Sequence, residues 1–226
     1  MRTVALLLFG ALVSLTAVSA ARAQRGSITS IGGYDILLQN ESVLKEIKLN
    51  EEQTTKVKET IHGVRRKYRG QLDALRSQGL GSLSDKARSI MDKISEETFV
   101  GLADVLDASQ LKRLRQIKLQ QDGLKGMLEG DIAKALKLTD AQRAKIRSIQ
   151  DDLHTEIRDA VQSTRPTDLQ AGLKRIGTLR KKALDQALTV LDAGQKKLWE
   201  EAAGEPFSLR FENSSSKGSK NQGKEP

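Results

Sequence analysis

The sequence contains no cysteine, which excludes disulfide bonds, thiol catalysis and metal sites built from thiolates. Aromatic residues make up only 3% of the chain, so any core must be formed by Leu, Ile, Val and Ala. A chain of this length can bury enough apolar surface to fold without cross-links. The strict alternation of apolar and polar residues that is typical of half-buried strands is also missing. We therefore expect a helical protein with an aliphatic core.

The first 23 residues have the features of a secretory signal peptide. Arg2 supplies a positive charge, residues 4–18 are mostly apolar, and Ala21-Arg22-Ala23 is a cleavage sequence ahead of Gln24. No cysteine follows it, which excludes a lipoprotein anchor, and no later segment is apolar enough to cross a membrane. The sequence predicts an exported chain, located in the periplasm if the organism is a Gram-negative-type bacterium.

The chain carries an excess of positive charge. Its formal net charge is +9, and removal of Arg2 and Arg22 with the signal peptide leaves +9 − 2 = +7. Such a balance favours anionic partners through long-range attraction. Export argues against nucleic acid as a partner and leaves an anionic envelope surface as a candidate.

A leucine, a small capping residue and, three positions after the cap, a glutamine occur in this order four times. The copies are Leu49-Asn50-Glu51-Glu52-Gln53, Leu106-Asp107-Ala108-Ser109-Gln110, Leu138-Thr139-Asp140-Ala141-Gln142 and Leu191-Asp192-Ala193-Gly194-Gln195. The first and third copies are 138 − 49 = 89 residues apart, and the second and fourth are 191 − 106 = 85 apart. The spacing indicates one unit repeated in tandem.

Each motif is a predicted helix start. Asn, Asp or Thr at the N-cap accepts a hydrogen bond from a first-turn N–H, while the glutamine at N3 reaches back to the N–H of the cap. The leucine before the cap can pack on an apolar residue eight positions later, which is Val57, Leu114, Ile146 or Trp199. On this interpretation the twelve leucines, caps and glutamines are structural residues.

Helical periodicity continues between the motifs. Apolar residues recur at spacings of three and four over residues 57–75 and 146–161, and again over residues 169–191. A second helix is predicted for residues 85–105, and Thr167 is a candidate cap after Arg165-Pro166. The predicted fold class is all-α, with two tandem helical-hairpin units in an elongated or cradle-like arrangement about a pseudo-twofold axis.

The predicted domain organisation follows from these patterns. It comprises a signal peptide (1–23), an N-terminal extension (24–35), a first unit (36–122), a second unit (123–207) and a disordered basic tail (208–226).

Charge is arranged in opposite order in the two units. A basic run, Arg65, Arg66, Lys67 and Arg69, lies on the first long helix of the first unit, and the following helix carries Glu96 and Glu97. In the second unit the first long helix is acidic and the second carries Arg180, Lys181 and Lys182. One interpretation is that antiparallel neighbours pair weakly along their edges. The other is that the seven cations contact a partner.

The four motifs, on an exported, cysteine-free, basic and helical chain, resemble the Spy/CpxP-like periplasmic proteins. Leu138-Thr139-Asp140-Ala141-Gln142 matches the Leu-Thr-x-x-Gln motif of that family, and the other copies replace Thr with Asn or Asp. The resemblance spans residues 37–207. It implies an ATP-independent chaperone that binds unfolded clients on a concave surface which is both basic and apolar.

The chain departs from that family in having four motifs where the family has two. The resemblance therefore implies a single-chain pseudo-dimer, which we expect to be a monomer in solution. Some relatives bind metals through histidines, but His62 and His154 are not at equivalent positions after their motifs. We expect no metal and no cofactor.

Three classes of function compete. The first is an exported chaperone-like or envelope-stress adaptor protein that binds unfolded or partner polypeptides, with the seven cations as its client contacts. The alternative is a non-catalytic envelope scaffold that binds an anionic polymer or a membrane surface. An enzyme is not expected, because the sequence has no phosphate-binding glycine loop, no nucleophile beside a histidine and no metal-ligand spacing.

Overall fold

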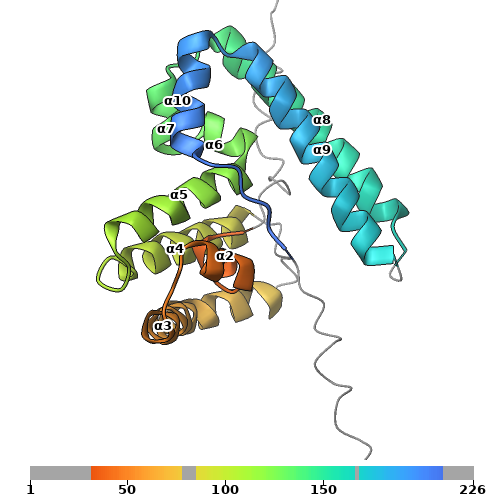
Figure 1. The fold of residues 1–226 in the computed structure, drawn as a ribbon. Helices are drawn as coiled ribbons and strands as arrows, with labels where there is room; N and C mark the ends of the chain where they lie inside the picture. The colour runs from red at the N-terminus through yellow and green to blue at the C-terminus, as the bar shows by residue number, and fades with distance from the viewer. Residues whose placement is uncertain (1–31, 78–84, 166–167, 211–226) are drawn as a thin grey trace, which may run out of the picture.

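The computed structural model describes residues 32–77, 85–165 and 168–210. Every regular element in these residues is an α-helix, so the predicted all-α fold class is confirmed (Figure 1). The first five helices are α1 (Tyr34–Leu37), α2 (Glu41–Glu46), α3 (Glu51–Ser77), α4 (Asp85–Gly101) and α5 (Ala108–Asp122). The next five are α6 (Leu124–Leu128), α7 (Gly130–Leu136), α8 (Asp140–Ser163), α9 (Leu169–Val190) and α10 (Ala193–Ala203).

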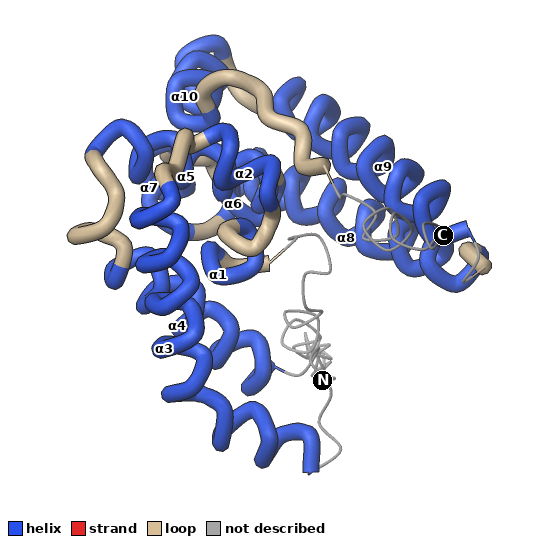
Figure 2. The backbone as a smooth tube through the Cα atoms, turned by 60° about the horizontal axis from the view of Figure 1, so that its bottom comes forward, coloured by secondary structure: helices blue, strands red, loops and turns tan. Residues whose placement is uncertain are grey.

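Two long helical hairpins diverge from a central body of shorter helices. Helix α3 packs against α4, and α8 packs against α9. Figure 2 shows both pairs leaving the region of α5, α6, α7 and α10 in different directions. Helix α10 contacts both α5 and α7, and α6 contacts α8 and α9. Helix α3 shares a buried cluster with α5, so the central body joins the two hairpins.

All four motifs begin a helix with reciprocal hydrogen bonds between cap and glutamine. Thr139, Asp107 and Asp192 each form a complete capping box with the glutamine three residues later. At the first motif, Gln53 N donates to Asn50 Oδ1 at 2.7 Å, and Asn50 N donates to Gln53 Oε1 at 3.3 Å. Each pair of bonds satisfies donors that a helix start otherwise leaves without a partner.

The glutamines also bind one another across each half. Gln53 Nε2 donates to Gln110 Oε1 at 2.8 Å, and Gln110 Nε2 returns a bond to Gln53 Oε1 at 3.1 Å. Gln142 and Gln195 form the same pair with the same two distances, 2.8 and 3.1 Å. The first motif therefore meets the second, and the third meets the fourth. Each glutamine amide therefore caps its own helix and also binds the glutamine at the start of the partner helix.

Main-chain carbonyls complete both glutamine pairs. Gln53 Nε2 also donates to Val105 O, and Gln142 Nε2 donates to Val190 O, each at 3.0 Å. This contact explains a difference from the predicted second helix, which was expected to reach residue 105. Helix α4 ends at Gly101, and tighter turns over Leu102–Leu106 direct the Val105 carbonyl towards Gln53.

The core consists of three aliphatic clusters. One lies in the first half and contains Leu37, Val57, Leu106 and Leu114 among its buried members. A second lies in the later helices and contains Leu138, Ile146, Leu191 and Trp199. In both halves the motif leucines and the apolar residues eight positions later share a cluster. The third cluster, around Tyr68, Leu75 and Ile90, joins α3 to α4 further along that hairpin.

Two predicted boundaries differ from the structure. The extension was expected to run to residue 35, yet Tyr34 and Asp35 belong to α1, and Asp35 is buried. The tail was expected to begin at residue 208, yet residues 208–210 lie on the first half, where Leu209 packs against the core. The rest of the predicted tail, the signal peptide and Thr167 lie outside the described residues.

Replacing Gln142 with Ala should lower the free energy of unfolding by about 1–3 kcal/mol, because Val190 O and the Thr139 N–H both lose a partner. The exposed Gln162→Ala on the same helix is the matched control and should change stability by less than about 0.5 kcal/mol. Urea denaturation measures both.

A double-mutant cycle tests the pairing itself. Gln142→Ala and Gln195→Ala should be non-additive by about 1 kcal/mol, since either change alone breaks the same two bonds. Strict additivity would mean that each glutamine serves only its own cap.

Candidate functional site

The seven predicted client contacts are unequally available. Arg65 donates from Nε and Nη2 to Asp35 Oδ2 at 3.0 and 2.7 Å, and the Asp35 side chain is 4% exposed. A charge buried to this extent depends on its partner. Arg65 is therefore committed to holding α1 on α3, whereas its neighbour Arg66 is exposed.

The other cations of the first run pair with acidic groups on the same hairpin. Lys67 Nζ lies 2.8 Å from Glu97 Oε1, which also accepts a bond from the Tyr68 hydroxyl at 2.5 Å. The bond from Lys67, followed by that from Tyr68, lowers the pKa of Glu97. Arg69 lies 3.7 Å from Asp73 one turn further along α3, and both side chains are largely exposed.

The two lysines of the second run also form ion pairs within their own hairpin. Lys181 pairs with Asp185 at 2.8 Å, and Lys182 pairs with Glu156 across the hairpin at 3.4 Å. Arg180 is half-buried, and burial lowers the pKa of its guanidinium group. The structure does not bring the two runs together, because one lies on α3 and the other on α9.

A different basic and apolar surface lies at the free end of the second hairpin. Val161 near the end of α8 is 56% exposed, and Leu173 in the first turns of α9 is 36% exposed. Four exposed cations are close to them in the sequence: Arg158, Arg165, Lys174 and Arg175. We call these six residues the tip patch. Arg175 Nη1 donates to Ser163 Oγ at 3.3 Å, a bond that joins α9 to α8 there.

The cations of the tip patch differ from those of the two predicted runs in their surroundings. Among the described residues, Arg158, Arg165 and Lys174 form no ion pair with a carboxylate. Residues 158–175 carry four cations and the two acids Asp159 and Asp168, a formal charge of 4 − 2 = +2. An exposed apolar group beside unpaired cations is suited to binding a chain that presents apolar and acidic groups.

Sequence reasoning missed the tip patch because it assigned Val161 and Leu173 to buried stripes. The helical period is correct, but near the end of the second hairpin Val161 and Leu173 face away from the helix that pairs with their own and stay exposed. The available signal was the position of both residues beside the break at Arg165-Pro166.

The two histidines have different surroundings. His62 is exposed on α3, while His154 on α8 is only 6% exposed, and neither of its ring nitrogens has a hydrogen-bond partner among the described residues. Burial lowers the pKa of His154; the charge of Asp151 raises it by a smaller amount, and that of Arg158 lowers it by less still.

The described residues contain no group of three His, Asp or Glu side chains placed to hold a metal ion. In the same residues no helix combines the length and the apolar character that crossing a membrane requires.

Comparison with known proteins found no matching family model, no matching curated protein and no matching solved structure. The resemblance to the Spy/CpxP-like proteins therefore stays a prediction from the four motifs.

Replacing Arg65 with Gln should destabilise the fold by about 1–3 kcal/mol, because Asp35 would keep its buried charge and lose its cation. This loss of stability is smaller than for a fully buried pair, because the Arg65 side chain is 40% exposed. Arg66→Gln, one residue away and exposed, is the control and should cost less than about 0.5 kcal/mol. Equal losses in urea denaturation would contradict a structural role for Arg65.

The stability of the protein should fall as the pH drops from 7 towards 5.5. The pKa of His154 is lower in the folded state than in the unfolded chain, so protons bind preferentially to the unfolded chain below its ordinary pKa of about 6.5. His154→Leu should remove most of this dependence in thermal melts, with His62→Gln as the control for loss of an imidazole. A wild-type slope in the His154 variant would exclude this group as its source.

Proposed function

We propose that the mature chain is an exported, ATP-independent chaperone-like or stress-adaptor protein that holds unfolded or partner polypeptides on exposed helical surfaces. It uses no cofactor and performs no catalytic turnover. The carrying observation is the tip patch, where Val161 and Leu173 are exposed beside four cations at the end of a projecting hairpin. The proposal places the protein with the Spy/CpxP-like family, as a duplicated chain whose two halves correspond to two protomers.

The mode of binding follows from the chemistry of the patch. Unfolded polypeptides expose apolar side chains, which gain free energy on contact with Val161 and Leu173. Cations accelerate the first encounter with an acidic client, and this effect declines with salt because the screening length is about 8 Å at physiological ionic strength. The hairpin end can offer these groups without unfolding, since neither apolar side chain belongs to a buried cluster.

The halves of the chain support a duplicated architecture in three respects. The order of a short helix, a long hairpin and a shorter helix recurs in α2–α5 and α7–α10. Both halves carry a glutamine pair with matching distances. Lys48 and Lys137, each just before a motif leucine, are the residues other than glycine with positive φ, at 55° and 46°, in the described chain.

The proposal is tested by suppression of the aggregation of a denatured client protein. Val161→Ser combined with Leu173→Ser should reduce suppression severalfold with an unchanged melting temperature, because both side chains are exposed. The matched control is Met91→Ser with Val100→Ser, two exposed apolar residues on α4. A loss as large in the control would mean that the protein binds clients by general surface hydrophobicity.

Charge reversal separates the tip patch from the cation runs predicted from the sequence. Lys174→Glu with Arg175→Glu should slow client capture by roughly threefold or more at low salt, with the difference lost at high salt. Lys181→Glu with Lys182→Glu makes the same change of charge at residues that already have acidic partners. Slower capture in the second variant than in the first would favour the predicted run. Binding of anionic vesicles or polymer without client capture would favour the scaffold.

A further inference from the structure

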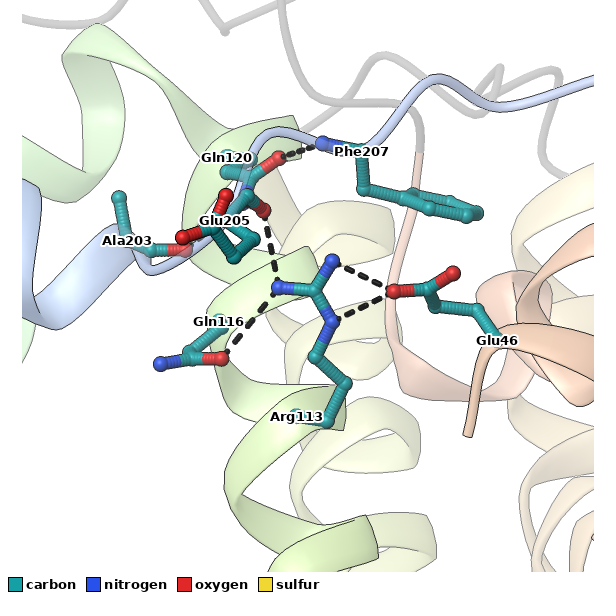
Figure 3. Close-up of polar contacts among 7 residues, drawn as sticks. All are labelled: Glu46, Arg113, Gln116, Gln120, Ala203, Glu205 and Phe207. Carbon is teal, nitrogen blue, oxygen red and sulfur yellow. Dashed lines mark hydrogen bonds and ion pairs between the residues drawn. The ribbon is translucent and has the colours of Figure 1, made fainter. Parts of the chain in front are cut away.

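The chain beyond α10 crosses from the second half onto the first. It turns at Gly204, whose φ of 62° and ψ of −161° are accessible in practice only to glycine. A Cβ at this position would also lie 2.4 Å from atoms of the Gln116 side chain. Residues 204–210, which we call the C-terminal segment, then run over α5 and α2 (Figure 3).

Helix α5 holds the main chain of this segment. Gln120 Nε2 donates to Glu205 O at 2.8 Å, and Gln120 Oε1 accepts the bond from Phe207 N at 2.8 Å. Arg113 Nη1 donates to Glu205 O at 2.9 Å, while its Nε and Nη2 donate to Glu46 Oε1 at 2.9 and 2.6 Å. As Figure 3 shows, Arg113 lies between α2 and the segment.

The start of α2 holds the far end of the segment. Asn40 Nδ2 donates to Arg210 O at 2.9 Å, and Ser42 Oγ accepts from Arg210 N at 3.2 Å. Each hydrogen bond between the first half and the segment thus reaches a main-chain atom. We call Asn40, Ser42, Arg113 and Gln120 the seat.

The side chains of the segment alternate between inside and outside. Phe207 and Leu209 are half-buried against the core of the first half, whereas Pro206, Ser208 and Arg210 are exposed. This is the alternation of an extended chain. The seat therefore recognises an extended backbone with apolar side chains two positions apart. It makes no hydrogen bond to a polar side chain of the bound segment.

The second half lacks the seat. Shifted by the 89 residues between the first and third motifs, Asn40, Ser42 and Glu46 correspond to Glu129, Asp131 and Ala135. Shifted by the 85 residues between the second and fourth, Arg113 and Gln120 correspond to Leu198 and Glu205. The repeated fold forms without these residues, so they belong to the first half alone.

We propose that the seat is a binding site for extended polypeptide segments with apolar residues at alternate positions, and that the C-terminal segment is its resident ligand. The inference rests on the proposed function, which supplies such segments as unfolded clients. A resident ligand of this kind keeps the site closed until a client displaces it. Because the segment is tethered, it competes at an effective concentration of the order of millimolar.

The experiment empties the seat in the full-length chain. Phe207→Ser with Leu209→Ser removes both apolar contacts of the segment and leaves the seat intact. The probe is a fluorescein-labelled peptide with the sequence of residues 204–210, and its binding is followed by fluorescence polarisation. The variant should bind the probe about tenfold more tightly than the wild-type chain, or better, since the tethered competitor is lost. A probe with Ser in place of its Phe and Leu should not bind.

Two further variants keep the test decisive. Gly204→Val strains the turn and pushes against the Gln116 side chain, while it leaves Phe207, Leu209 and the four residues of the seat in the sequence. This variant should also raise probe affinity. Gln120→Leu, added to the Phe207→Ser and Leu209→Ser variant, removes two main-chain contacts with the segment and a third with Ala203 O, and should abolish the gain. Circular dichroism verifies the fold of each. If neither dislodged variant binds the probe more tightly than the wild type, or if the gain survives Gln120→Leu, the proposal is overturned.

The aggregation assay on the same proteins distinguishes a failure of the seat proposal from a failure of the proposed function. Probe binding without suppression of aggregation would retain the seat and defeat the chaperone-like function. Suppression by the wild type that does not increase in the dislodged variants, together with no gain in probe binding, would defeat the seat and leave the function standing.

Discussion

The architecture depends on two pairs of glutamine amides. Each amide closes a capping box on its own helix through Oε1 and uses Nε2 to bind the partner glutamine and a carbonyl from the turn that leads into the partner's helix. Glutamate could cap but not donate, and a shorter asparagine could not span both tasks, so the residue type follows from the geometry. The local signal for a helix start and the tertiary contact between two helix starts are therefore the same side chain. This coupling fixes how each long hairpin leaves the central body.

A hairpin fixed at one end must be stabilised along its length by packing alone. On α3 and α4 the cluster around Tyr68 and Ile90 extends the core well beyond the motifs. On α8 and α9 buried residues continue to Ile157 and Ala160, after which Val161 is exposed. No third element covers the ends among the described residues. The second hairpin thus leaves apolar groups exposed near its end, together with cations that favour acidic partners.

The sequence was sufficient for what local chemistry determines. Caps and helical period are short-range patterns, and they predict the helices that the structure contains. It was insufficient for contacts between residues distant in sequence. The salt bridge of Arg65 with Asp35 spans 30 residues and has no local signature. Residues 208–210 looked like the start of a polar tail because only Leu209 is apolar there, and their order comes from Asn40 and Ser42, about 170 residues away.

The two halves are alike where the fold requires it and different where a partner would meet them. Both keep the cap, the glutamine pair and the positive φ before the motif leucine. They differ at the seat, where the four polar residues of the first half correspond in the second to three acids and a leucine. In the second half, Val161 and Leu173 are exposed near the free end of the hairpin. Under the proposed function, the seat in the first half and the tip patch in the second are two separate binding surfaces. Two such surfaces on one chain would let it bind one extended polypeptide at two points. Joining two weak sites in this way raises the overall affinity without any new contact.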